Sequence, residues 1–276
     1  MRRTLALTTI LAAAWAAIAA ADGGGPSPGV IFGSPGVTDR GASLRYVALP
    51  DGPGTTVAVL RARGGEVLRW KYVRGSFGVP AVAYDGSTEG LALNGRRLVL
   101  ASGPRYGAPT RFVVLNPRTL RVRARLLLHG AFAFDALSPG GSLMYLIQYL
   151  GAPNASGVQP YAVRALNLNT RKLYAGAIVD RRERDEKMSG IALTRARSRD
   201  GAWAYTLYSR ARKGPFVHAL DTIHRRAFCV DLPWRKSANN WLGEVRLRVV
   251  PGRLDLRRGD RTIATVDTHT FEVSRG

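Results

Sequence analysis

The side chains most able to do chemistry in this chain are carboxylates that lie beside short apolar runs. Glu89 precedes the run at 90–93, Asp135 lies inside the run at 134–137, and Asp185 comes shortly before the run at 190–193. If these runs are equivalent strands of a repeated unit, the carboxylates converge near a central axis, where they could bind a cation or a hydroxyl-rich ligand. We therefore predict a ligand-binding face whose candidate residues are Asp85, Glu89, Asp135, Asp185, Glu186, Lys187, Trp234 and Trp241.

Two parts of this prediction depend on exposure. Residues 180–187 read D-R-R-E-R-D-E-K, so their charges could instead form local ion pairs of little energy. Trp234 and Trp241 flank a polar loop at 236–240, and we expect them to be the most exposed pair of tryptophans. Trp203 lies in an aromatic strand and is expected to be buried.

Well-known catalytic and metal-binding motifs are missing from the sequence. There is no Gly-x-Ser-x-Gly elbow, no phosphate-binding loop and no His-Glu-x-x-His or Cys-x-x-Cys pair. The favoured hypothesis is therefore a non-enzymatic binding or scaffold module, for which we expect no cofactor. The alternative is a lactonase- or hydrolase-like enzyme whose channel carboxylates surround a water molecule or a Ca²⁺ ion.

The elements that must position these residues follow a repeat of about 50 residues. Each copy has an apolar residue, then Asn or Asp, then a turn that contains Thr, and the starts are 55, 51, 54 and 46 residues apart. The four clear copies begin at Leu115, Leu166, Leu220 and Val266, and a degenerate copy begins at Leu60. Short strands and tight turns at this period are typical of the blades of a β-propeller.

A second marker gives the number of strands in each unit. The apolar runs at 90–93, 134–137 and 190–193 are each followed by a hairpin signal and then by a strand rich in aliphatic or aromatic residues. The sequence thus predicts an all-β fold, a single β-propeller of four-stranded blades after an N-terminal signal helix. Five blades fit the length best, with six if the blades are short. We expect residues 44–49 and 262–273 to pair and close the ring.

The hairpins also resemble those of a known group of propellers. Ser138-Pro139-Gly140-Gly141 with Tyr145, and Ser198-Arg199-Asp200-Gly201 with Tyr205, resemble the blade signature of the bacterial YVTN and TolB-like families, which are WD40-like propellers. The resemblance covers residues 90 to 273. It implies the propeller fold and a location outside the cytoplasm, and it implies no single activity.

The N-terminus resembles an export signal. Arg2 and Arg3 precede an alanine-rich apolar stretch at 5–21 that ends in small residues, which predicts a secretory signal peptide over 1–21. The alternative is an uncleaved signal anchor, the one case in which we expect contact with a membrane. We assign 22–40 to a flexible linker and 41–276 to the propeller domain. The expected location is secreted or at the cell envelope.

The charge bears on the partners. The chain has 41 Lys and Arg against 19 Asp and Glu, a net charge of +22 that comes almost entirely from arginine. Such a field attracts anionic polymers or phospholipid head groups, although arginine excess also accompanies a GC-rich genome. No segment combines basic and stacking aromatic residues in a nucleic-acid-binding module. We expect a monomer whose partner is an unknown protein or an anionic envelope polymer, and we expect no nucleic-acid partner.

Overall fold

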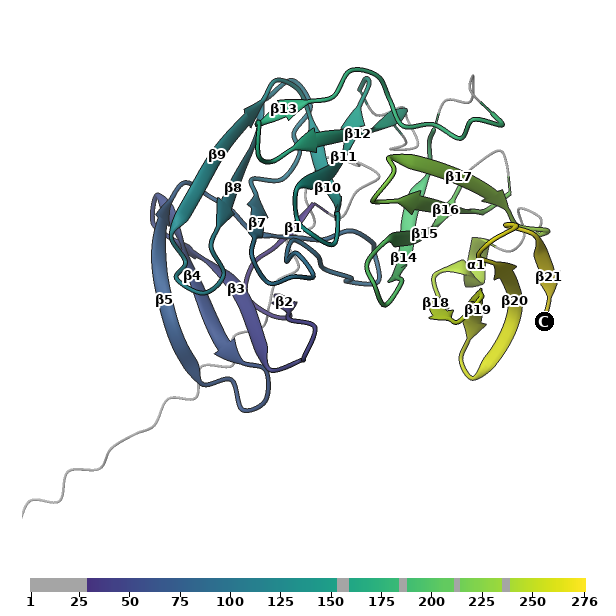
Figure 1. The fold of residues 1–276 in the computed structure, drawn as a ribbon, viewed down its shortest axis with the longest axis horizontal. Coiled ribbons are helices and arrows are strands. Elements are labelled where there is room, and N and C mark those ends of the chain that lie inside the picture. Colours follow the sequence, from purple (N-terminus) through teal and green to yellow (C-terminus); the bar gives the residue numbers. More distant parts are fainter. Residues whose placement is uncertain (1–28, 153–158, 184–187, 211–213, 235–238) are drawn as a thin grey trace, which may run out of the picture.

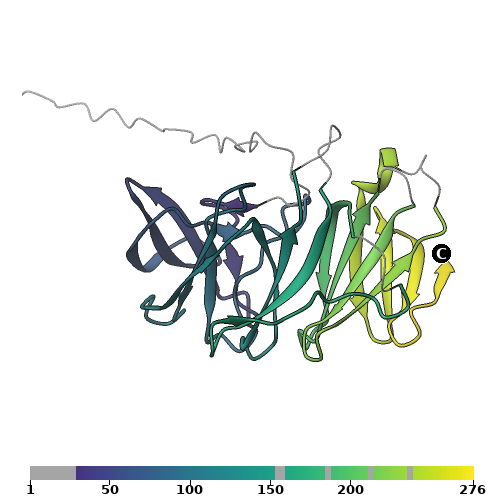
Figure 2. The same ribbon diagram turned by 90° about the horizontal axis from the view of Figure 1, so that it is seen from above.

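The fold is a series of antiparallel β-sheets that follow one another along the chain. The computed structural model describes residues 29–152, 159–183, 188–210, 214–234 and 239–276. Figure 1 shows the sheets side by side on an arc that begins at β2–β5 and ends at β18–β21. In Figure 2 the same twisted sheets lie one beside the next. This radial array of four-stranded meanders is the architecture of a β-propeller, as the repeat predicted.

Each of the five sheets pairs its strands in chain order, and we number them blades 1 to 5. Blade 1 contains β2 (Val37–Thr38), β3 (Leu44–Asp51), β4 (Gly54–Arg61) and β5 (Val67–Arg74). Blade 2 contains β7 (Leu98–Ala101), β8 (Thr110–Leu115) and β9 (Val122–Leu128). Blade 3 contains β10 (Phe132–Leu137), β11 (Leu143–Tyr149), β12 (Tyr161–Asn167) and β13 (Lys172–Leu173). Blade 4 contains β14 (Ile191–Arg197), β15 (Trp203–Ser209), β16 (Phe216–Asp221) and β17 (Arg226–Asp231), and blade 5 contains β18 (Val245–Val250), β19 (Arg253–Arg258), β20 (Arg261–Asp267) and β21 (Val273–Arg275).

Blade 2 has a shortened first strand. Leu91 forms an isolated bridge with Leu98, and Gly90 accepts a hydrogen bond from the backbone N–H of Val99 at 2.7 Å. Residues 90–92 therefore take the place of a first strand. A separate two-stranded sheet joins β1 (Val30–Ile31) to β6 (Val79–Pro80), and the described residues contain one helix, α1 (Asn239–Leu242).

The core lies between neighbouring blades. Four apolar clusters separate the five sheets: one between blades 1 and 2, and one for each later pair. Because an inner blade is covered on both faces, some of its strands are buried along their whole length, as in Leu98–Ala101 and Phe132–Leu137. This packing is why the sequence shows continuous apolar runs rather than strict alternation.

The repeated Asn or Asp builds the turn between the third and fourth strands. Its side-chain oxygen accepts hydrogen bonds from the backbone N–H groups two and three residues later, in the turns of Asn116, Asn167, Asp221 and Asp267. The fourth residue after it always has a positive φ, at Leu120, Arg171, Arg225 and Phe271. In blade 1, Gly65 has the same φ sign four residues after Arg61. The period in the sequence is therefore a repeated side-chain-to-backbone turn.

Replacing Asn116 with alanine should lower the free energy of unfolding by about 1 kcal/mol, because the turn loses hydrogen bonds to the N–H groups of Arg118 and Thr119. Urea denaturation would measure the change. Arg118→Ala, an exposed change in the same turn, is the control and should be neutral. Equal stability of the two variants would contradict a structural role for the repeated Asn.

Two sequence predictions about the ends of the fold are wrong. The sequence predicts a flexible linker over 22–40, yet within its described part β1 pairs with β6, and β2 pairs with β3 as the first strand of blade 1. The predicted pairing of 44–49 with 262–273 does not occur among the described residues, since β3 pairs with β2 and β4 while β20 pairs with β19 and β21. The physical reason is the same for both. Blade 1 takes its first strand from the supposed linker, so neither terminal blade lacks a strand that the other end could supply.

The predicted signal peptide lies outside the described residues. Within the described part of the chain, no helix has the length and apolar character needed to cross a lipid bilayer.

Candidate functional site: an ionic cluster at the ring axis and a cationic cleft beside it

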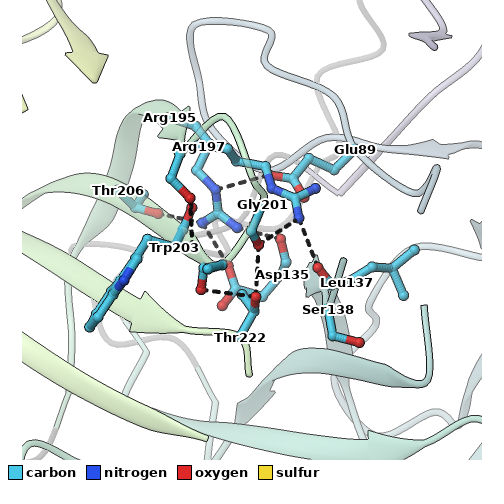
Figure 3. Close-up of polar contacts among 12 residues, drawn as sticks. Glu89, Asp135, Leu137, Ser138, Arg195, Arg197, Gly201, Trp203, Thr206 and Thr222 are labelled. Atoms are coloured by element: carbon cyan, nitrogen blue, oxygen red, sulfur yellow. Dashed lines mark hydrogen bonds and ion pairs between the residues drawn. The ribbon is translucent and has the colours of Figure 1, made fainter. Parts of the chain in front are cut away.

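One residue from each of blades 2, 3 and 4, in or just before the first strand, converges at a common point. Each lies three residues before the residue that closes its blade's first hairpin, which is Ala92, Ser138 or Ser198. The converging residues are Glu89, Asp135 and Arg195, and Figure 3 shows them together. Repetition of the blade thus places three ionisable groups at equivalent positions, two acidic and one basic.

Arg195 is the centre of this group, which we call the axial cluster together with Arg197 and Thr206. Its Nε donates to Glu89 Oε1 at 3.1 Å, its Nη1 donates to Asp135 Oδ1 at 2.8 Å and to Thr206 Oγ1, and its Nη2 donates to the Asp135 carbonyl at 2.6 Å. The side chains of Arg195, Glu89 and Asp135 are 3%, 7% and 4% exposed. A guanidinium therefore occupies the place between the carboxylates where a metal ion would have to bind.

The charges of the axial cluster balance. Arg197 Nη1 donates to the second oxygen of Glu89 at 3.2 Å, so two arginines face two carboxylates. Burial alone would lower the pKa of Arg195, but the carboxylates of Asp135 and Glu89 outweigh it and raise that pKa above its usual value. Arg195 is a permanent cation, and the residues present do not suit a bound Ca²⁺ ion.

The axial cluster also fixes the first hairpin of blade 4. Arg197 Nη2 donates to the carbonyl of Leu137 in blade 3 at 2.8 Å and to the carbonyl of Gly201 at 3.3 Å. Thr222 Oγ1 donates to the same Gly201 carbonyl at 2.8 Å, as Figure 3 shows. The hairpin at 198–202 is thereby held to two blades.

The space beside Asp135 is very small. The cavity that its side chain lines, together with Tyr161 and Tyr208, has a volume of about 10 Å³. This is the size of one water molecule. His218, on the strand next to Thr206, is also fully buried, and burial lowers the pKa of its imidazole to about 4. Burial thus favours the neutral form of His218. The cavity beside Asp135 is too small for a substrate.

One cleft lies on the face that carries the first hairpins of the blades, which we call the hairpin face. It measures about 1000 Å³ and lies mainly between blades 4 and 5, although Arg40 of blade 1 and Leu93 of blade 2 also line it. Its aromatic walls are Trp203, Tyr205, Phe228 and Phe271, and its rim carries Arg40, Arg199, Arg226, His269 and Asp200. The hairpin held by Arg197 forms one side of it. The axial cluster therefore positions a wall of the cleft without lining it.

The aromatic walls are rigid. Phe228 and Phe271 stack with ring centroids 4.4 Å apart, and Trp203 contacts both rings, at 6.1 and 5.5 Å. Asp200 is already bonded, since it accepts hydrogen bonds from Ser198 Oγ and from the Ala202 N–H. These bonds, the one from Ser198 foremost, lower the pKa of Asp200. Arg226 is bonded as well, since its guanidinium pairs with Asp221 at 2.8 Å. Among the described residues, the arginines of the cleft that remain without a carboxylate partner are Arg40 and Arg199.

The structure places the other predicted site residues apart from this cleft. Asp85 lies in the segment between β6 and β7 and accepts hydrogen bonds from the N–H and hydroxyl of Ser87. Asp185, Glu186 and Lys187 lie outside the described residues. At the start of the same segment, Asp180 forms the kind of local ion pair that the alternative interpretation expected, with Arg182 at 2.7 Å.

The exposure predicted for the tryptophans is wrong. Trp234 and Trp241 are half-buried because their rings pack edge to face, 5.0 Å apart, against the core between blades 4 and 5. Trp70 is much more exposed, at 65%. Trp203, expected to be buried, is half-buried at the wall of the cleft.

Sequence reasoning missed Arg195 because it aligned the wrong residues. The runs at 90–93 and 190–193 look equivalent, but the first begins two residues before its hairpin residue Ala92 and the second begins eight before Ser198. A register shift between Ala192 and Thr194 in β14 adds to the offset. Counting back from the hairpin residues would have paired Glu89 and Asp135 with Arg195 instead of Asp185.

The sheets and their arrangement define the chain as a β-propeller protein. No family model matches it, and no curated protein is significantly similar in sequence. Solved structures similar to this chain include the hydrazine synthase of Kuenenia stuttgartiensis, with 13% identity, a TM-score of 0.46 and coverage of 86% of this chain and 64% of that one. The Cps50 (Swd1) β-propeller domain of Myceliophteria thermophila has 10% identity, a TM-score of 0.49 and coverage of 84% and 64%. TolB from Acinetobacter baumannii has 11% identity, a TM-score of 0.41 and coverage of 84% and 50%. The chain spans less than two thirds of each of these three chains, and similarity at this level concerns the fold alone.

Proposed function

We propose that this chain is an exported, non-enzymatic binding module of the bacterial cell envelope, and that the cleft on its hairpin face binds an anionic ligand. The observation that carries the proposal is the lining of the cleft. Arg40, Arg199 and His269 lie around stacked aromatic walls. Arg226, by contrast, is paired with Asp221, and the single carboxylate of the lining, Asp200, is already hydrogen-bonded.

The chemistry of the lining indicates the kind of ligand. An arginine fork pairs with a carboxylate or a phosphate through two parallel hydrogen bonds. Aromatic faces such as that of Trp203 stack against flat apolar surfaces, including those of sugar rings. A cleft of about 1000 Å³ has room for several such units. An acidic glycan or a similar anionic envelope polymer satisfies all three features.

The axial cluster argues against the alternative of a lactonase- or hydrolase-like enzyme. That alternative needs Glu89 and Asp135 to face a substrate, a water molecule or a cation. Both carboxylates are instead paired with Arg195, and the cavity that Asp135 lines is about 10 Å³. A lactone ring does not fit there.

The envelope location is supported by two features of the sequence. Residues 1–21 have the pattern of a signal peptide, and the net charge of +22 favours partners of opposite charge. Fractionation of cells that express the chain with and without residues 2–21 would test this part. Export of both forms, or of neither, would contradict the assignment.

Removal of cleft arginines should weaken binding of an acidic oligosaccharide. With oligogalacturonate as the probe, Arg40→Gln and Arg199→Gln should each lower affinity about tenfold in titration calorimetry, because each removes a charge-assisted hydrogen bond of about 1.5 kcal/mol. Neutral dextran of the same length is the ligand control. Arg261→Gln, an exposed arginine of blade 5 that does not line the cleft, is the protein control and should bind as the wild type does.

Two outcomes would overturn the proposal. Equal binding of the acidic probe to all variants would show that the cleft is not the site. Hydrolysis of a lactone or 4-nitrophenyl ester that is lost in Asp135→Asn but kept in Arg199→Gln would favour the enzyme instead.

A further inference from the structure

The outer strands of blades 1 and 2 differ from those of the other blades. β5 exposes Val67, Trp70 and Tyr72, and β9 exposes Val122 and Leu127. The equivalent strands β13, β17 and β21 expose no large apolar side chain. All five strands are the outermost of their blades, but β5 and β9 have 8 and 7 residues, whereas β13 and β21 have 2 and 3.

The same two strands are cationic and carry no carboxylate. β5 reads VLRWKYVR and β9 reads VRARLLL. The longer segment that contains β9 is cationic too, because residues 90–134 contain eight arginines, no lysine, and no aspartate or glutamate. The segment 90–134, which contains β7, β8 and β9, therefore carries positive charge without the carboxylates found elsewhere in the chain.

A groove joins β5 to β9. It measures about 560 Å³, its floor is apolar at Phe77 and Leu126, and its edges carry Arg74, Arg111 and Arg125. An adjoining hollow of about 430 Å³ shares Phe77 and Arg111 and adds Arg105. Neither hollow is lined by an acidic residue.

The groove is ordered by contacts between the two blades. Arg125 Nη1 donates to the backbone carbonyl of Arg74 at 3.0 Å, and its guanidinium lies 5.9 Å from the centre of the Phe77 ring. The two outer strands are thus held side by side at the edge of blades 1 and 2, and Trp70 and Tyr72 project from the face of β5 opposite to Val73, which packs between the two blades. We call β5, β9 and the groove between them the outer rim.

We propose that the outer rim docks on an anionic lipid surface. Arginine and lysine gain about 1 kcal/mol each near such a surface, and tryptophan and tyrosine favour the interface between head groups and acyl chains. The rim combines both kinds of side chain: Trp70, Tyr72 and Leu127 could enter the interface while Lys71, Arg74 and Arg125 meet phosphates. A soluble polyanion would use the cations but gain little from five exposed apolar side chains.

This surface is separate from the cleft. The two sites share no lining residue, and Figure 1 shows β5 and β9 at one side of the molecule and blades 4 and 5, which supply most of the cleft lining, at the other. A protein bound to lipid through the rim would keep its cleft open to ligand. The two proposals can therefore fail independently.

Vesicle co-sedimentation of the full chain tests the proposal. Wild-type protein should bind vesicles of phosphatidylglycerol and phosphatidylcholine more tightly than vesicles of phosphatidylcholine alone, and the difference should shrink between 0.1 and 0.5 M NaCl. The double variant Lys71→Gln/Arg74→Gln should lower affinity for the anionic vesicles about 30-fold, because each lost charge removes about 1 kcal/mol of binding free energy. Trp70→Ser should lower it about tenfold through lost apolar contact.

The control is Arg246→Gln/Arg248→Gln, which removes two exposed charges from β18 of blade 5 and should leave vesicle binding unchanged. All variants keep the same N-terminal 21 residues, and near-wild-type thermal melts would confirm that they fold. Equal losses in the rim and control variants would overturn the proposal, since net charge alone would then explain binding. So would tight binding of polyphosphate that needs Lys71 and Arg74 but not Trp70, because it would identify the rim as a site for a soluble polyanion.

Discussion

Replacing Arg195 with methionine should destabilise the protein by about 3–5 kcal/mol, the usual cost of removing one partner from a buried ion pair. Glu89 and Asp135 would remain buried without the guanidinium that both now contact. Natural domains have about 5–15 kcal/mol of stability in total, so this single change could remove a large part of it. Urea denaturation followed by circular dichroism would measure the loss.

The loss should depend on the carboxylates. If uncompensated charge is its cause, Glu89→Gln and Asp135→Asn added to Arg195→Met should recover part of the stability, as a charged cluster replaced by neutral groups often does. Arg199→Met, an exposed arginine four residues away, is the matched control and should be neutral within about 0.5 kcal/mol. A loss below about 1 kcal/mol for Arg195→Met would mean that the axial cluster does not hold the blades together.

The stability of the protein should fall as the pH falls from about 6.5 to 4, by about 3 kcal/mol, because of His218. Burial lowers the pKa of this histidine to about 4, while its unfolded value is about 6.5. Between these values the unfolded chain binds nearly one more proton than the folded chain. Stability is therefore complete above the unfolded pKa and is lost progressively below it.

The charged groups that face His218 act in opposite directions. Asp135 and Asp180 favour its protonated form, and Arg195 opposes it, but burial outweighs all three. Its Nε2 has no hydrogen-bond partner among the described residues. A proton there would have to be buried without a direct acceptor.

Replacing His218 with leucine should flatten the stability profile between pH 6.5 and 4.5. The carboxylates whose pKa is lowered by hydrogen bonds, such as Asp221 and Asp267, lose their contribution only below their unfolded values of about 4, so they barely affect this window. His129→Gln, at an exposed position, is the control and should keep the wild-type profile. Denaturation curves at pH 7.0, 6.0, 5.0 and 4.5 would test this. An unchanged slope in His218→Leu would assign the acid sensitivity to another group.

The two carboxylates of the axial cluster could be predicted from the sequence, but the arginine that neutralises them was missed. The repeat brought Glu89 and Asp135 to equivalent places, and the structure does bring them together. The third equivalent residue is a cation, which changes the interpretation from a metal or catalytic site to a neutralised structural centre. The two interpretations differ in the residue of blade 4 that is aligned with Glu89 and Asp135, and that alignment is given by the distance to the hairpin residues rather than by the apolar runs.

The cleft and the outer rim required the tertiary structure for a different reason. The cleft takes Arg40 from blade 1, Arg199 and Trp203 from blade 4, and Phe271 from blade 5. Residues so far apart in sequence meet only because the hairpins of successive blades lie on one face. Likewise, the sequence around Trp70 indicates only a strand, and the exposure of its side chain is known only from the tertiary structure.

The sequence by itself determined the period, the four-stranded blade and the turn that ends each third strand. These features depend on contacts within a few residues, such as the hydrogen bonds of Asn116 and Asp267 to the N–H groups just beyond them. Only the tertiary structure decided that residues 29–40 belong to the fold, that Arg195 joins the two carboxylates, and where the arginines gather. Those outcomes depend on how whole sheets pack against one another, and the strand register that governs this packing is set by contacts distant in the chain.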